Sequence, residues 1–265
     1  MIKNIVKRYF SKVDDKWIQK SERLRLQKLP RYQYTETLLK GSKVCVVDAN
    51  TFLSSLDEIF SEEIYKFNTS DNVINIIDCG ANIGLATIYF KMNYPAAKVI
   101  AFEPDPQIFK VMKNNILSFG FKDVDFRNEA ISDSDGLINF HTEGGHSGMI
   151  VKESKTNDVV SVKATRLKSV MEQMGEITFL KLDIEGHEVN VLPDIAEQLK
   201  RVKYLFLEYH SFIGTDQKLG ELLKIIEQAG LRYYLKEAYN KPFPFINREI
   251  FLKMDFLVNI LCYRE

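Results

Sequence analysis

The residues best suited to chemistry form a glycine loop directly after a buried strand, Asp78-Cys79-Gly80-Ala81-Asn82-Ile83-Gly84. The apolar run over 73–77 is typical of that strand, and the spacing over 83–93 predicts a helix that ends before Pro95. A glycine loop between a parallel strand and a helix is where open α/β sheets bind nucleotide-like ligands. The loop therefore predicts a ligand site at the start of the helix.

A second acidic residue follows at a meaningful distance. Residues 98–103 read as a strand that ends in Glu103, about 20 residues beyond the loop, where a ribose-binding carboxylate is expected. The loop holds only Gly80 and Gly84, so the dinucleotide pattern G-x-G-x-x-G is absent. We therefore expect a ligand with a ribose but without a pyrophosphate.

Strands and helices alternate along the chain, and these elements must position the residues named above. A doubly wound α/β fold is the expectation, because alternating strand and helix patterns favour a parallel sheet. Further strands are predicted over 124–127, 177–182, 202–207, 231–235 and 256–262, and further helices over 56–67, 106–119, from 188 onward, and 216–229. Two hairpins are also predicted, one over 43–53 around Ala49-Asn50 and one inserted between 137–141 and 159–165.

Polar residues gather where four of the predicted parallel strands end. They are Asp78, Glu103, Asp183 with Glu185, and Glu208 with His210. The carboxyl ends of parallel strands share one edge of the sheet, where ligands bind. A single acid at a strand end is usually a helix cap or a solvated residue, but four such ends predict a shared site.

The first 40 residues of the chain are basic. They hold eleven Lys and Arg against four Asp and Glu, although the 265-residue chain has a net charge of zero. Apolar residues separate the basic ones, so we expect a partly helical extension over 1–45 that packs on a domain over 46–265. Contact of this arm with nucleic acid or an anionic membrane surface is the alternative.

The cysteines and the apolar runs bear on the cellular compartment. Cys45, Cys79 and Cys262 lie far apart, without metal-ligand spacing, which indicates free thiols and a reducing compartment. No apolar run approaches membrane-spanning length, and the N-terminus lacks the apolar core of a signal peptide. A cytoplasmic protein is the expectation, with peripheral membrane contact through the basic arm left open.

Three blocks of the sequence together resemble the signatures of FkbM-type methyltransferases. They are 78–84, Phe102-Glu103-Pro104 and 183–188, and they occur in the family's order across roughly residues 56–210. The resemblance implies the seven-stranded class I methyltransferase fold, S-adenosylmethionine as cofactor, and methylation of hydroxyl oxygens on sugars and natural products. His187 stands where the family often has a small residue, so no role is carried onto it.

The resemblance also implies roles for residues around the cofactor. The glycine loop would approach its amino-acid portion, Glu103 would accept hydrogen bonds from both ribose hydroxyls, and 129–130 would form the adenine wall. Helix capping is the competing role for Glu103, and a turn exit is the competing interpretation of 129–130. The cofactor-binding residues expected in this way are Asp78, Gly80, Ala81, Asn82, Gly84, Glu103, Pro104, Glu129, Ala130 and Asp183.

The acceptor side is expected among the later strand ends. Asp183 should lie beside the transferred methyl group, and His210 is the preferred general base because imidazole titrates near neutrality. Glu208 would hold the tautomer of His210, since alternate strand residues share a side; a structural ion pair of these two residues is equally compatible with the pattern. Glu188 has an equally good explanation in the helix dipole.

Two further histidines and a possible metal site are less well supported by the sequence. His141 and His146 are weaker candidates, the latter in the glycine-rich tip of the inserted hairpin. Asp183, Glu185, Glu208 and His210 offer metal-binding atoms, but their spacing is not diagnostic. The sequence thus predicts no metal.

These observations favour an S-adenosylmethionine-dependent O-methyltransferase for a sugar hydroxyl, glycan precursor or related small polar acceptor. One alternative is a methyltransferase that reaches RNA or protein through the basic arm, with nucleic acid the less expected partner. Another is a non-catalytic cofactor-binding protein. A nicotinamide oxidoreductase is disfavoured because the third glycine is missing.

Overall fold

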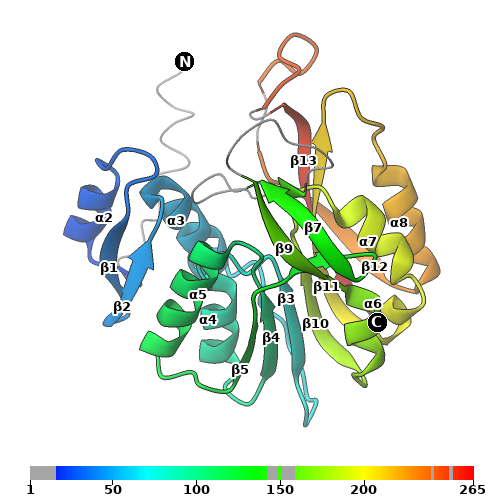
Figure 1. Cartoon of the computed structure of the whole chain (residues 1–265), viewed down its shortest axis with the longest axis horizontal. Coiled ribbons are helices and arrows are strands. Elements are labelled where there is room, and N and C mark those ends of the chain that lie inside the picture. Colours follow the sequence, from blue (N-terminus) through cyan, green and yellow to red (C-terminus); the bar gives the residue numbers. More distant parts are fainter. Residues whose placement is uncertain (1–15, 142–148, 151–158, 240–241, 251–252) are drawn as a thin grey trace.

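The computed structural model describes residues 16–141, 149–150, 159–239, 242–250 and 253–265. His146 lies outside these residues, and of His141 only the backbone is described. The centre of the molecule is a seven-stranded sheet (Figure 1). In spatial order its strands are β12 (Arg232–Glu237), β13 (Met254–Tyr263), β11 (Val202–Phe212), β10 (Ile177–Leu182), β3 (Asn75–Cys79), β4 (Lys98–Phe102) and β5 (Val124–Arg127).

The strands from β11 to β5 run parallel, and β13 is antiparallel to both of its neighbours. Strand β3 lies between β10 and β4, with Asp78 paired to Lys181 on one side and to Ala101 on the other. The carboxyl ends of β3, β4, β10 and β11 therefore meet at one edge. This confirms the mostly parallel α/β sheet expected from the sequence.

Helices cover both faces of the sheet, because its central strands are buried on both sides. Neighbouring residues of β10 show the division: Phe179 packs into one core and Leu180 into the other. The first core includes helices α4 (Leu85–Asn93) and α5 (Pro106–Ser118). The second includes α6 (Leu167–Glu172), α7 (Glu188–Asp194) and α8 (Leu219–Gln228).

The N-terminal segment contains helix α2 (Lys20–Leu26), a hairpin of β1 (Thr35–Leu39) and β2 (Ser42–Val46), and helix α3 (Ala49–Leu56). The hairpin expected over 43–53 is therefore misplaced. Lys40 and Gly41 make the turn with positive φ angles of 51° and 84°, the conformation that a tight hairpin turn requires. Residue Ala49 instead begins α3, because Asp48 caps that helix by accepting a 2.9 Å hydrogen bond from the Thr51 amide.

Helix α3 continues into a π-helical turn, Asp57–Ser61, so the helix expected over 56–67 begins and ends earlier. The N-terminal segment packs against the domain through this turn. Arg23, which is 5% exposed, donates hydrogen bonds of 3.0 and 2.6 Å to the two carboxylate oxygens of Asp57. Leu26 is fully buried in the same core as α4. The described part of the extension consists of a short helix and a hairpin.

The inserted region forms a second, four-stranded sheet of β6 (Ala130–Ser132), β9 (Val159–Arg166), β7 (Gly136–His141) and β8 (Met149–Ile150). The expected antiparallel pairing of 137–141 with 159–165 is present between β7 and β9. Strand β6 adds to β9 in parallel, and β8 pairs with β7. In the part of the chain that the structure describes, no helix is both long and apolar enough to cross a membrane.

Candidate active site

The glycine loop is fixed against the end of β10. Gly80 has a φ of 81°, and a Cβ atom there would lie 1.9 Å from the carbonyl oxygen of Asp183. Gly84 begins α4 with a φ of 92°, and a Cβ atom would lie 3.0 Å from Cγ1 of Ile116. Both positions need glycine because protein atoms approach closely, which is a reason that the motif alone does not reveal.

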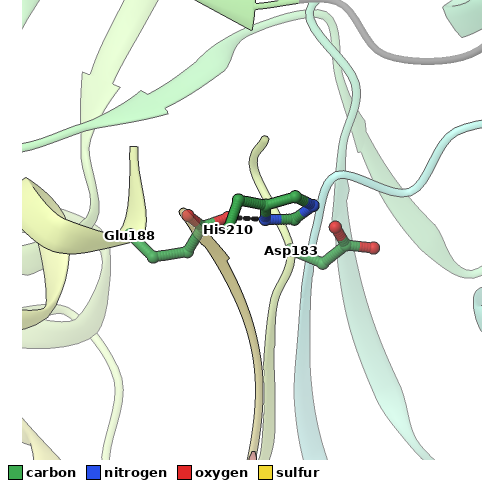
Figure 2. Close-up of side chains that lie close together, drawn as sticks. All are labelled: Asp183, Glu188 and His210. Carbon is green, nitrogen blue, oxygen red and sulfur yellow. Dashed lines mark ion pairs between the residues drawn. The ribbon is translucent and has the colours of Figure 1, made fainter. Parts of the chain in front are cut away.

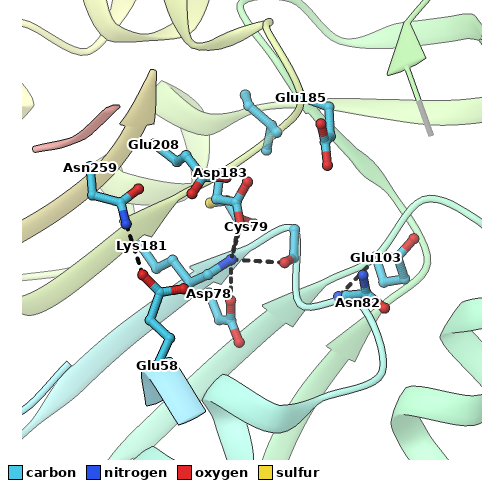
Figure 3. A network of polar contacts seen from close by, with 12 residues as sticks. Glu58, Asp78, Cys79, Asn82, Glu103, Lys181, Asp183, Glu185, Glu208 and Asn259 are labelled. Carbon is cyan, nitrogen blue, oxygen red and sulfur yellow. Dashed lines mark hydrogen bonds and ion pairs between the residues drawn. The ribbon is translucent and has the colours of Figure 1, made fainter. Parts of the chain in front are cut away.

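Glu103 is joined to this loop. It is 7% exposed, and its two carboxylate oxygens each accept a 2.9 Å hydrogen bond, from the amides of Asn82 and Asp105. Burial raises the pKa of Glu103 to about 8, and the negative charge of Asp105 adds to this effect, against the two amide donors and Lys181. The carboxyl group therefore lies beside the loop, as Figure 3 shows.

Lys181 is the centre of a buried polar network that the sequence analysis did not identify (Figure 3). Its Nζ donates a 2.9 Å hydrogen bond to the Gly80 carbonyl and lies 3.1 Å from Oδ2 of Asp183 and 3.5 Å from Oδ1 of Asp78. Burial favours the neutral amine, but Asp183 and Asp78 outweigh it and raise the pKa of Lys181 well above its usual value. The available signal was a single ionisable residue in the otherwise apolar run from Phe179 to Leu182.

Asp78 is completely buried. Its Oδ2 accepts a 2.7 Å hydrogen bond from the Thr87 hydroxyl in α4, and its other oxygen faces Lys181. This geometry ties β3 to α4 and to β10. Asp78 thus orients the loop from behind rather than facing the pocket described next.

A pocket opens at the carboxyl edge of the sheet. The glycine loop forms one wall through Gly80, Ala81 and Asn82, and helix α3 with its π-helical turn forms another. Acidic and basic side chains from the strand ends line its floor. They are Lys181, Asp183, Glu185 and Glu208, with Glu58 opposite.

The carboxylates in this pocket affect one another. Burial raises the pKa of Glu185 to about 8, and neighbouring carboxylates add to this rise. Burial and the negative charge of Asp183 raise the pKa of Glu208. Burial acts in the same direction on Asp183, but Lys181 and His210 outweigh it and lower the pKa of Asp183. Several of the acids thus compete for few cationic neighbours.

His210 lies below the pocket floor and is 5% exposed. Its Nε2 is 3.3 Å from Oε2 of Glu208 and 3.4 Å from Oε2 of Glu185, and its Nδ1 is 3.3 Å from Oε1 of Glu188 (Figure 2). Burial favours the neutral ring, but these carboxylates outweigh it and raise the pKa of His210 well above its usual value. The expected neighbourhood of Glu208 and His210 is present, with two further acids around the ring.

Glu58 is a pocket residue that sequence reasoning missed. Its Oε1 accepts a 2.9 Å hydrogen bond from Nδ2 of Asn259 in β13. Burial and the nearby Glu208 raise the pKa of Glu58 to about 7, although Lys236 opposes them. Glu58 and Asn259 are 201 positions apart in the chain, so only the fold brings them together.

Several expected cofactor residues are not among those that line this pocket: Gly84, Glu103, Pro104, Glu129 and Ala130. Glu129 accepts hydrogen bonds from Lys163 (2.6 Å) and Thr165 (2.5 Å) of β9, so its carboxylate faces the second sheet. Ala130 is buried in the small core of that sheet. The carbonyl of Pro104 accepts a 2.9 Å hydrogen bond from Nδ2 of Asn128. These contacts give 129–130 a structural role in holding the second sheet.

The seven-stranded sheet, with helices on both faces and the antiparallel β13 inserted between β11 and β12, has the topology of a class I methyltransferase. The chain belongs to the methyltransferase FkbM domain family, whose model matches residues 78–233. Methyltransferase sdnD of Sordaria araneosa is 30% identical over 175 residues, which cover 53% of this chain and 68% of that protein. The 31-O-demethyl-FK506 methyltransferase FkbM of Streptomyces tacrolimicus is 25% identical over 236 residues, covering 74% and 88% respectively.

A solved structure has the same fold. It is an S-adenosylmethionine-dependent methyltransferase from Agrobacterium tumefaciens, with a TM-score of 0.52 and 10% sequence identity. The likeness covers 89% of this chain and 72% of that one. At this identity the comparison shows the architecture alone.

Proposed function

We propose that the protein is an S-adenosylmethionine-dependent O-methyltransferase whose acceptor is a hydroxyl of a sugar, glycan precursor or related small polar molecule. The observation that carries this proposal is the pocket in which the glycine loop directly faces the carboxylates of Asp183 and Glu208. The names of two relatives agree with oxygen acceptors. One is a 2-O-methyltransferase, NoeI, of Sinorhizobium fredii and the other is the 31-O-demethyl-FK506 methyltransferase.

The residues on the loop side fit the cofactor. An ionised carboxylate has about four lone-pair sites, and the backbone amides of Asn82 and Asp105 occupy two of those of Glu103. Two remain for the neighbouring hydroxyls of a ribose. The cofactor supplies a methyl group already activated on a sulfonium, so the protein must chiefly bind, align and remove a proton.

Glu208 is the proposed general base. It lines the pocket beside Asp183, whereas His210 does not. The acceptor oxygen takes the methyl group and Glu208 takes the proton that this oxygen loses. His210 then holds Glu208 from below through the 3.3 Å contact of Nε2 with Oε2, which reverses the roles that the sequence favoured.

Three arginines in the described part of the basic extension give little support to a macromolecular acceptor. Arg23, Arg25 and Arg31 each form an ion pair with a carboxylate of the chain itself. Contact with phosphates would have to break these pairs. A small polar acceptor therefore remains the proposal.

Calorimetry with S-adenosylhomocysteine tests the cofactor assignment. We expect the wild type to bind and Glu103→Ala to lose most of its affinity, while Glu221→Gln, at an exposed position of α8, binds normally. A wild type that gives no binding heat would refute the cofactor. Transfer of a labelled methyl group to a panel of nucleotide sugars, uronic acids and glycans tests the acceptor class, and labelling of RNA or protein alone would contradict it.

A further inference from the structure

Asp183, Glu188 and His210 bring their side chains to one point from three elements. Asp183 follows β10, Glu188 begins α7 and His210 belongs to β11. One potential metal-binding atom from each lies within 4.8 Å of the other two. Figure 2 shows the ring of His210 between the two carboxylates.

Two polar atoms in this group lack hydrogen-bond partners although their residues are buried. Nδ1 of His210 lies 3.3 Å from Oε1 of Glu188, but the geometry leaves it without a hydrogen bond. Oε2 of Glu188 is also without a partner, and Glu188 is 0% exposed. Buried polar atoms are rarely left unsatisfied, because desolvation without a partner is costly.

The distance between Nδ1 of His210 and Oε1 of Glu188 matches that between two ligands of one metal ion. Ligand atoms at about 2.1 Å from a cation are roughly 3.0 to 3.4 Å from their neighbours in octahedral or tetrahedral geometry. Nδ1 of His210 and Oε1 of Glu188 are 3.3 Å apart, whereas Glu208 and Glu185 lie 3.3 and 3.4 Å from the other ring nitrogen, Nε2. A metal-bound imidazole usually donates its other N–H to a carboxylate, and here carboxylates lie on both sides of the ring.

The cluster holds more carboxyl groups than cationic side chains. Among the described residues, the ion pairs of Asp183, Glu185, Glu188 and Glu208 all go to Lys181 or His210. Four carboxylates thus share two cationic side chains in a mostly buried site. Charges in such a site are costly unless they are paired or bind a cation.

We propose that Asp183, Glu188 and His210 bind a divalent metal cation. Carboxylates suit Mg²⁺ and Mn²⁺, and an imidazole moves the preference toward a transition metal, so Mn²⁺ matches this set best. Glu208 and Glu185 lie at the other ring nitrogen, Nε2, where they can accept its N–H while Nδ1 faces the cation. Where the proposed methyltransferase function holds, the cation would also orient the acceptor oxygen beside Asp183 and make its proton easier to remove; binding of the cation itself does not depend on that function.

Electron paramagnetic resonance with Mn²⁺ as the probe tests the site directly, since the signal of free aqueous Mn²⁺ decreases when the ion binds. The full chain is freed of metal with a chelator, dialysed and titrated with Mn²⁺. We expect the wild type to bind a single equivalent, and Asp183→Asn and His210→Gln each to weaken binding by about tenfold or more. The matched control His187→Gln removes a histidine that lies 3.6 Å from Asp133 and should bind as the wild type does.

The proposal is overturned if the wild type leaves millimolar Mn²⁺ free, or if Asp183→Asn binds Mn²⁺ with wild-type affinity. Circular dichroism checks that each variant folds. If His210→Gln does not fold, Asp183→Asn alone decides the test. The Asp183 side chain is 25% exposed, so this substitution should disturb the fold less. Calorimetry with S-adenosylhomocysteine separates the two proposals. Cofactor binding without Mn²⁺ binding overturns the metal site alone, and Mn²⁺ binding without cofactor binding supports the metal site while refuting the methyltransferase proposal.

Discussion

The backbone amide of Asn82 donates a 2.9 Å hydrogen bond to Oε2 of Glu103. This bond joins the glycine loop after β3 to the end of β4, the neighbouring strand. Asn82 adopts a left-handed conformation with a φ of 49°, which turns its amide toward the carboxylate. The glycine loop and Glu103, the proposed ribose-binding residue, therefore form one structural unit. Changes in Glu103 should affect both stability and ligand binding.

Glu103 should make stability fall as the pH rises. Its pKa in the folded protein is about 8, above the ordinary value of 4.5, so between these values the folded state holds a proton that the unfolded state releases. Stability decreases with pH wherever the folded state binds more protons. Relative to the wild type, Glu103→Gln should gain stability from pH 5 to pH 8, measured by urea unfolding.

The exposed Glu221 supplies the control for that series, since Glu221→Gln should follow the wild-type pH trend. A constant difference between Glu103→Gln and the wild type across the range would contradict the prediction. Ligand affinity should show the opposite trend. Ribose hydroxyls donate to the ionised carboxylate, so binding of S-adenosylhomocysteine should strengthen up to about pH 8 and lose this dependence in Glu103→Gln.

Gly80→Ala should destabilise the fold more than Gly120→Ala. Both glycines have a φ of 81°, so both substitutions carry the same left-handed strain, roughly 1–3 kcal/mol. Only at Gly80 would the new Cβ meet another atom, the Asp183 carbonyl oxygen at 1.9 Å, whereas nothing lies within 4 Å at Gly120. The difference between the two unfolding free energies measures the clash, and equal losses would show that the loop moves freely away from β10.

Much of the fold could be predicted from the sequence because its signals are local. The apolar run of β10, the acids near the ends of four parallel strands and the Asp105 cap of α5 are all readable in short windows. The first hairpin was misplaced because the prediction put its turn at Ala49-Asn50. The turn lies at Lys40-Gly41, whose sequence is a weaker turn signal. In that region the Asp48 cap decided in favour of a helix.

The candidate site was only partly predictable because its contacts depend on backbone geometry and on distant segments. Glu185 and Gly186 both have positive φ angles, 56° and 97°, and this turn directs Glu185 and Glu188 to opposite sides of the His210 ring. No periodicity rule reports such a turn. Glu58 and Asn259 illustrate the second limit, since their contact exists only once β13 has paired with β11.

Lys181→Met should cost more stability than Lys91→Met. Both lysines are nearly fully buried. Removal of Lys181 leaves Asp78 and Asp183 without their nearest cation, and breaking a buried ion pair from one side costs about 3–5 kcal/mol. Lys91 donates to the carbonyl oxygens of Pro95 and Ala97 as well, but its only charged partner among the described residues is Asp123, whose side chain is 68% exposed and remains solvated.

Chemical unfolding of the two variants checks this ranking. The double variant Asp78→Asn with Lys181→Met should recover part of the loss, because it removes one of the stranded charges. A Lys181→Met variant as stable as the wild type would show that the network contributes nothing net. Equal costs for the two lysines would show that burial alone, and not the charge of the aspartates, sets the penalty.

Turnover should depend more on Glu208 than on His210 if the proposed roles are right. Glu208 lines the pocket and His210 lies beneath it. Loss of a general base typically lowers kcat by about 10² to 10⁴, so Glu208→Gln should fall in that range with its affinity for S-adenosylhomocysteine unchanged. His210→Gln should keep more activity, because the carboxylate that takes the proton remains. The comparison uses single-turnover rates with an acceptor that the panel shows to receive the methyl group. His187→Gln is the matched histidine control. A Glu208→Gln variant that binds the cofactor and keeps its activity, together with a large loss of activity in His210→Gln, would instead make the imidazole the base.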